Sequence, residues 1–163
     1  MDFHPEKQLK LRPIAESDEA FLAKLYASTR AEEMAQSGWA QAEIDKFLLF
    51  QFKAQHQYYQ MEFPNAQFDL IMLGTQAVGR LYIDRRHDEI RIIDIALLPE
   101  HRGKSLGGKL LGELIDESEK VSLPIRIHVE YNNPAMRFYQ RLGFKKTGET
   151  GVYYLMERPV SNL

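Results

Sequence analysis

The stretch that decides the fold is Ile95–Gly108, which reads IALLPEHRGKSLGG. Its apolar first part predicts the end of a strand. The leucines that follow, from Leu106 onward, recur at helical spacing and predict a helix to about Lys120. A glycine-rich turn between a strand and a helix directs unpaired backbone N–H groups toward whatever lies above it. We therefore expect this loop to bind an anion.

The sequence on either side of this stretch predicts a mixed α/β fold. Strands joined by short turns pair antiparallel, whereas the helix between strands 90–98 and 125–130 makes a βαβ unit, whose two strands are parallel. Asn133 is expected to cap a helix of about ten residues that begins at Pro134 and stops at Gly143. The expected strands are 7–14, 68–73, 77–83, 90–98, 125–130, 144–150 and 152–157.

The N-terminal third is predicted to be mostly helical. Ser17 is expected to cap a first helix, and a second helix is expected over 41–60. We find no repeat, linker or low-complexity segment, so the expectation is one domain over residues 1–163.

Composition excludes several classes of function. The chain has 163 residues and no cysteine, which removes a cysteine nucleophile and thiolate metal sites. Its net charge of −2 offers no general attraction for nucleic acid or an anionic membrane. The histidines show no metal-ligand spacing, so no metal is expected. The first residues lack a basic region followed by an apolar stretch, so we expect a cytoplasmic protein.

The glycine-bearing loop also fits the nucleophile elbow of serine hydrolases. Residues 103–107 match G-x-S-x-G, with Ser105 as the nucleophile. That reaction needs an acid and a histidine downstream. The only later Asp is Asp116, about 16 Å along the same helix, and the only later His is His128. The hydrolase is therefore the minor alternative.

A better match is to a known family. The loop resembles the acyl-CoA loop of the GNAT superfamily of N-acetyltransferases, whose pattern is Q/R-x-x-G-x-G/A. Arg102 fills the first place and Gly107 the last, while Ser105 stands where the family usually has its first glycine. Asn132, Ala135, Tyr139 and then Gly143-Phe144 resemble the family's second signature, N-x-x-A-x-x-x-Y-x-x-x-G-F.

The resemblance implies a GNAT-like sheet, mixed and mostly antiparallel with one parallel βαβ pair, and helices on both faces. It implies that acetyl-CoA is the co-substrate and that its acetyl group passes directly to a primary amine. Tyr139 would give a proton to the leaving thiolate. The expected cofactor-binding residues are Ile95, Ala96, Leu97, Arg102, Gly103, Lys104, Ser105, Leu106, Gly107, Gly108, Asn132 and Tyr139.

The base and the acceptor site are less defined. Asp94, His128 and Glu130 on predicted strands are the candidate bases, because an amine must lose a proton before or during attack. Asp94 and Glu130 are preferred. Glu33, Trp39 and Tyr59 are the expected acceptor-binding residues, for a small-molecule or peptide amine. The alternative from another class is a non-catalytic acyl-CoA-binding or interaction module. A homodimer through an exposed edge of the C-terminal strands is compatible with the sequence.

Overall fold

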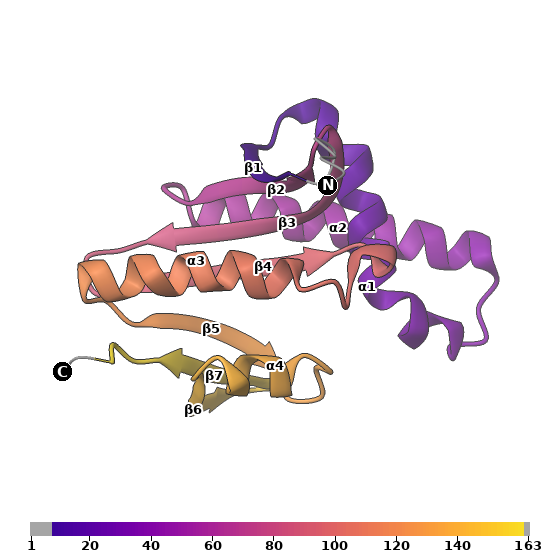
Figure 1. Ribbon diagram of the computed structural model, residues 1–163. Coiled ribbons are helices and arrows are strands. Elements are labelled where there is room, and N and C mark those ends of the chain that lie inside the picture. Colours follow the sequence, from indigo (N-terminus) through magenta and orange to yellow (C-terminus); the bar gives the residue numbers. More distant parts are fainter. Residues whose placement is uncertain (1–7, 162–163) are drawn as a thin grey trace. The chain divides into compact units, whose positions relative to one another are not determined.

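The computed structural model describes residues 8–161 (Figure 1). Lys7, the expected start of the first strand, lies outside these residues. Within them, seven strands form one mixed sheet in the order β1-β2-β3-β4-β5-β7-β6. Each expected strand overlaps an observed one, and the fold class is α/β, as predicted. The chain divides into two compact units, Met1–Leu81 with Ile95–Leu106 and Tyr82–Asp94 with Gly107–Leu163.

The first unit contains a pair of helices and the first strands. Strands β1 and β2 pair antiparallel, with Leu9 opposite Leu73 and Pro13 opposite Asp69. Helices α1 and α2 follow β1 along the chain and precede β2 (Figure 1). The elements that lie wholly or partly in this unit are β1 (Leu9–Pro13), η2 (Glu16–Asp18), α1 (Glu19–Ala35), α2 (Gln41–Glu62), β2 (Gln67–Leu73), β3 (Gln76–Arg85), β4 (Ile90–Leu97) and η3 (Pro99–His101).

The apolar core of this unit lies among α1, α2 and β2. Leu22 on α1, Phe52 on α2 and Leu70 on β2 are almost completely buried and belong to one cluster. Such burial of large apolar side chains contributes about 2 kcal/mol each to folding. Leu22 and Phe52 therefore mark the buried faces of α1 and α2.

The expected cap at Ser17 is wrong. Ser17 lies inside the short 3-10 turn η2, and α1 begins at Glu19. The cause is Asp18, whose Oδ2 accepts the backbone N–H of Ala15 at 2.7 Å and whose Oδ1 pairs with Arg12 Nη2 at 2.9 Å. These contacts fold the chain into a tight turn before the helix starts.

The second unit carries α3 and the C-terminal strands. Strand β5 pairs parallel with β4, with Ile90 opposite Ile125, and antiparallel with β7, with Ile125 opposite Arg158. Strand β6 pairs antiparallel with β7 and forms the edge of the sheet. The parallel pair confirms the predicted βαβ unit. The remaining elements of this unit are α3 (Leu106–Val121), β5 (Ile125–Glu130), α4 (Met136–Arg141), β6 (Lys145–Thr150) and β7 (Tyr153–Arg158).

Helix α4 is shorter than predicted. It begins at Met136 rather than at Pro134, because residues 133–136 form a separate turn. In that turn Asn133 Oδ1 accepts the N–H of Ala135 at 2.8 Å, and the carbonyl of Asn133 accepts the N–H of Met136. Asn133 therefore satisfies backbone donors ahead of the helix, while Gly143 ends it as expected.

Candidate active site

The loop after β4 has a defined backbone geometry. Arg102 Nε donates to the carbonyl of Leu97 at 3.0 Å, which holds the start of the loop against the end of the strand. Gly103 and Ser105 both have left-handed φ angles, +72° and +63°. Helix α3 begins directly afterwards at Leu106. The first N–H groups of a helix have no partner within it, and the helix dipole favours negative charge there.

The left-handed φ angle of Ser105 explains why the GNAT loop pattern usually has glycine at this position. A residue with a Cβ pays about 1–2 kcal/mol to adopt the left-handed region, and Ser105 does so. The departure from the family pattern therefore costs backbone strain at Ser105.

The last residues of β4 lie close to β3. A side chain at Gly79 would collide with the backbone of Ala96 and with the side chain of Leu97. The carbonyl of Leu97 already accepts a hydrogen bond from Nε of Arg102. These contacts fix the backbone of Ala96 and Leu97, two of the expected cofactor-binding residues.

Helix α4 packs on the first turn of α3. A Cβ placed at Gly107 would lie 3.7 Å from Phe138 Cζ, and one at Gly108 would lie 3.9 Å from Phe138 Cε2. The ring of Phe138 thus faces both glycines at ordinary van der Waals distance. Because Tyr139 follows Phe138 in the chain, this packing ties the helix that bears Tyr139 to the start of α3.

Tyr139 is held by a helix-ending motif. The N–H of Phe144 donates to the carbonyl of Tyr139 at 3.1 Å, and the N–H of Gly143 donates to the carbonyl of Gln140 at 3.0 Å. This Schellman pattern requires the left-handed residue that Gly143 supplies, at φ +97°. The sequence Gly143-Phe144 therefore fixes the backbone and ring of Tyr139.

The environment of Tyr139 favours the protonated phenol. Its side chain is buried, 5% exposed, and its ring lies 5.6 Å from Phe138 and 5.8 Å from Phe144. Burial raises the pKa of Tyr139 well above its ordinary value, and the negative charge of Asp94 raises that pKa further. The geometry thus brings two expected catalytic residues, Tyr139 and Asp94, within electrostatic range of each other.

The other residues expected around β5 lie at its end. Glu130 is half-buried, and it lies opposite Tyr153 in the antiparallel register of β5 and β7. Asn132 is exposed in the turn after β5, and its neighbour Asn133 makes the capping contact. Asn132 is thus accessible to a ligand.

The expected acceptor residues do not form one wall. Glu33 is exposed near the end of α1 and pairs with Arg30 at 3.5 Å. Trp39 lies just before α2, is 47% exposed and meets Phe47 edge-on at 5.3 Å. Tyr59 lies about 27 Å along α2 from its first residue, Gln41. Trp39 lies just before the start of α2 and Tyr59 lies near its end. The structure therefore separates these two residues.

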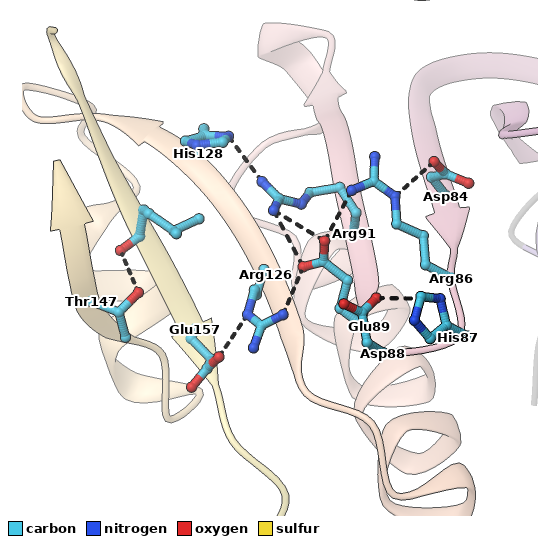
Figure 2. Close-up of polar contacts among 11 residues, drawn as sticks. Asp84, Arg86, His87, Asp88, Glu89, Arg91, Arg126, His128, Thr147 and Glu157 are labelled. Carbon is cyan, nitrogen blue, oxygen red and sulfur yellow. Dashed lines mark hydrogen bonds and ion pairs between the residues drawn. The ribbon is translucent and has the colours of Figure 1, made fainter. Parts of the chain in front are cut away.

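The second unit contains a buried charge cluster that the sequence did not predict. Figure 2 shows the carboxylate of Glu89 meeting the guanidinium groups of Arg86, Arg91 and Arg126, at N···O distances of 3.0–3.2 Å. Arg126 also pairs with Glu157 at 2.7 Å. Glu89 is only 4% exposed, and its arginine partners keep its pKa below the ordinary value although burial alone would raise it.

His128 belongs to the edge of this cluster. Its Nδ1 lies 3.0 Å from Arg91 Nη1 (Figure 2). Burial lowers the pKa of His128, and the neighbouring charge of Arg91 lowers that pKa further. One ring nitrogen of His128 is therefore committed to Arg91, which weakens the case for His128 as the histidine of a serine hydrolase.

Two features are absent from residues 8–161. Across these residues, no three or more His, Asp or Glu side chains are placed to hold a metal ion. In the same part of the chain, no helix combines the length and apolar character needed to cross a membrane.

Comparison with known proteins identifies the family. The model of the acetyltransferase (GNAT) family matches residues 23–144, so the chain belongs to this family. The [ribosomal protein bS18]-alanine N-acetyltransferase of Haemophilus influenzae (strain ATCC 51907 / DSM 11121 / KW20 / Rd) is 30% identical over 82 residues, which are 50% of this chain. A candidate enzyme of the same name from Bacillus subtilis (strain 168) is 29% identical over 99 residues, or 58% of this chain. The matches cover 56% and 64% of those two relatives.

Solved structures share the fold. The PaiA N-acetyltransferase of Thermoplasma acidophilum, determined in complex with coenzyme A, superposes with a TM-score of 0.70 at 17% identity and covers 93% of this chain and 99% of its own. PH1933 from Pyrococcus horikoshii OT3 superposes with a TM-score of 0.66 at 23% identity, over 96% of this chain and 100% of its own. The family match over residues 23–144 confirms the GNAT resemblance of the sequence, and these structures share its fold.

Proposed function

We propose that this protein transfers the acetyl group of acetyl-CoA to a primary amine. The observation that carries the proposal is the packing of Phe138 against Gly107 and Gly108. It joins the helix bearing a proton donor, Tyr139, to the start of a helix suited to bind a pyrophosphate. The first glycines of α3 and the helix that bears an acid for the leaving group thus pack together within the second unit.

The proposed cofactor site uses mainly backbone groups. The N–H groups from Gly103 to Gly108 would bind the pyrophosphate, helped by the dipole of α3. Lys104 adds a positive charge in the loop. The backbone of Ile95, Ala96 and Leu97 would align the pantetheine arm, and Asn132 would add a side-chain contact. Backbone binding explains how a chain with net charge −2 can hold a polyanion.

The proposed reaction is direct transfer without an acyl-enzyme. The amine nitrogen attacks the thioester carbonyl, the C–N bond forms and the C–S bond breaks. Tyr139 gives its phenolic proton to the departing thiolate. Like an ordinary tyrosine, it is protonated at neutral pH, because burial raises its pKa. A carboxylate accepts the proton that the amine loses, and we assign this role to Asp94 or Glu130.

The acceptor we propose is a primary amine of a protein or peptide. This class is supported by the relatives that are named for acetylating an alanine of a ribosomal protein. Glu33 and Trp39, at the connection between α1 and α2, would contact the acceptor through charge and an aromatic face. A small-molecule amine is the competing acceptor class.

A transfer assay tests the proposal. The purified protein is incubated with acetyl-CoA and a panel of amines: a peptide with an N-terminal alanine, a polyamine and an aminoglycoside. Thiol release and the mass of the acetylated amine are measured. Amine-dependent release with acetylation supports the enzyme. Acetyl-CoA binding without release for any amine points to a non-catalytic module, and ester hydrolysis abolished by Ser105→Ala points to the hydrolase.

A further inference from the structure

Alternate residues of β5 form a polar face. His128 is exposed on this face, and Glu130, two residues later, is half-buried. The intervening Val129 belongs to the opposite face and is 2% exposed. Tyr153 of β7 lies opposite Glu130 in the register and is 40% exposed. We call His128, Glu130 and Tyr153 the β5–β7 site, and all three residues belong to the second unit.

The ring of His128 is held by contacts with two neighbouring strands. Its Nδ1 lies 3.0 Å from Arg91 Nη1 (Figure 2), and its centroid lies 6.5 Å from that of the Tyr153 ring, with the two rings inclined at 76°. Arg91 is fixed in turn by Glu89, whose two carboxylate oxygens accept hydrogen bonds from its Nη2 at 3.1 and 3.2 Å. A buried carboxylate therefore sets the orientation of the His128 ring through Arg91.

The contact with Arg91 determines which nitrogen of His128 carries a proton. A guanidinium group can only donate hydrogen bonds, so Nδ1 of His128 must accept with its lone pair. Burial and the charge of Arg91 lower the pKa of His128, which favours the neutral ring at neutral pH. The neutral ring then carries its proton on Nε2. His128 therefore offers one N–H donor on the face that also bears Glu130, without a positive charge that would repel an amine.

We propose that His128 selects the acceptor by donating from Nε2 to the carbonyl oxygen of the acceptor's first residue. The acceptor is then a peptide α-amine, in which a carbonyl carbon lies two bonds from the amine nitrogen. Glu130, one of the two proposed bases, would meet the amine itself. This selection rests on the proposed acetyl transfer and specifies its acceptor.

The spacing of the donor and the carboxylate suits this pair of groups. Residues two apart on a strand lie about 6.8 Å from each other. An amine and the carbonyl next to it, each making one hydrogen bond of about 2.9 Å, span a distance of this order. A lysine side chain or a polyamine has no carbonyl so close to its amine, so it would leave the Nε2–H of His128 without this partner.

Matched acceptors test the selection. A peptide with an N-terminal alanine is compared with the same peptide in which a methylene group replaces the first carbonyl. His128→Phe, which keeps a ring but has no N–H, should raise KM about 10-fold for the first peptide and leave KM for the second unchanged. The comparison is made within each peptide, so the different basicity of the two amines cancels. Turnover of the second peptide also shows that the variant is folded.

Two further variants complete the comparison. His128→Gln places an amide N–H near the position of Nε2 and should recover most of the lost affinity for the alanine peptide. His87→Phe changes a histidine of the same unit whose side chain is 94% exposed, and it should leave KM for both peptides unchanged. A KM that His128→Phe changes by the same factor for both peptides, or for neither, overturns the selection and leaves acetyl transfer intact.

Peptide binding without chemistry separates the selection from the proposed function. The alanine peptide is titrated calorimetrically into the full chain in the presence of CoA. Binding that His128→Phe weakens and His128→Gln restores supports the selection even if no acetyl group is transferred, and the absence of transfer then contradicts only the proposed function. Absence of both peptide binding and acetylation overturns both proposals.

The protonated nitrogen of His128 can be measured directly. Nuclear magnetic resonance of protein isotope-labelled at its histidine ring nitrogens reports the tautomer, and the signals of His128 are assigned by their absence in His128→Gln. We expect the proton on Nε2 at neutral pH. A proton on Nδ1, or a charged ring, would overturn the proposal, because Nδ1 would then not accept from Arg91.

Discussion

Phe144 donates its backbone N–H to the carbonyl of Tyr139 and packs its ring edge-on against the Tyr139 ring, with centroids 5.8 Å apart. Both contacts depend on Gly143, whose φ of +97° turns the chain back on α4. Gly143, four residues after Tyr139 in the chain, thereby positions the proposed acid.

Gly143→Ala should destabilise the protein by about 1–2 kcal/mol, because alanine is strained in the left-handed region. The nearest atom to a new Cβ, in Arg158, lies 3.5 Å away, so backbone strain rather than a clash is the cause. Thermal unfolding measures the loss. Gly112→Ala, in α3 with open space around it, is the matched control and should not lower the melting temperature. Equal behaviour of the two variants would show that the turn does not need glycine.

Tyr139→Phe should lower turnover about 100-fold or more, because the leaving thiolate loses its proton donor. Acetyl-CoA affinity, measured by calorimetry, should be unchanged since the ring and its packing remain. Tyr26→Phe removes a hydroxyl that contacts Gln51 in the first unit and should leave turnover intact. The raised pKa of Tyr139 also predicts that kcat does not fall near pH 10, where an ordinary tyrosine ionises. Full activity of Tyr139→Phe would assign Tyr139 to packing alone.

Ser105→Gly should stabilise the protein by up to about 1 kcal/mol, since it relieves the strain of φ +63° at some cost in chain entropy. Acetyl-CoA affinity should be retained or improved, because the loop keeps its shape. Lys104→Gly, next to it but without a left-handed φ, should instead lose stability. Chemical denaturation compares the three proteins. A less stable Ser105→Gly would mean that the serine side chain, and not the backbone, determines the loop.

Glu89→Gln should destabilise the second unit by about 3 kcal/mol, because three guanidinium groups lose a buried carboxylate. The pKa of Glu89 is lowered in the folded state, so its charge stabilises the fold above the unfolded pKa of about 4.3. That stabilisation is lost as the pH falls through the lower folded pKa.

Denaturation midpoints measured from neutral to acid pH should therefore fall less steeply in Glu89→Gln than in the unmodified protein. The exposed Glu113→Gln is the control and should track the unmodified chain. If both variants behave alike, the cluster carries no net stability.

Local patterns predicted the fold well. The loop 102–108 and the segment from Asn132 to Phe144 identified the βαβ unit and α4, because turns and helix ends are encoded by neighbouring residues. The predicted cap of α1 was wrong by one residue, Ser17 in place of Asp18, since Asp18 contacts Arg12 six positions earlier. Sequence spacing does not reveal such a contact.

The candidate site was only partly predictable. The packing of Phe138 on Gly107 and the influence of Asp94 on Tyr139 join segments far apart in the sequence. The Glu89 cluster likewise depends on strand pairing that places Arg91 beside Arg126. The sequence offered one signal for this cluster: charged residues at alternate positions of a strand share one face of the sheet. Glu89 and Arg91 have this spacing, and Arg126 on the next parallel strand is also charged.

The central claim is that the loop between β4 and α3 binds acetyl-CoA. Calorimetric titration of the full chain with acetyl-CoA, with CoA and ATP as comparison ligands, tests it most directly. We predict saturable binding of acetyl-CoA that ATP does not reproduce. Absence of saturable acetyl-CoA binding at millimolar ligand would contradict the account.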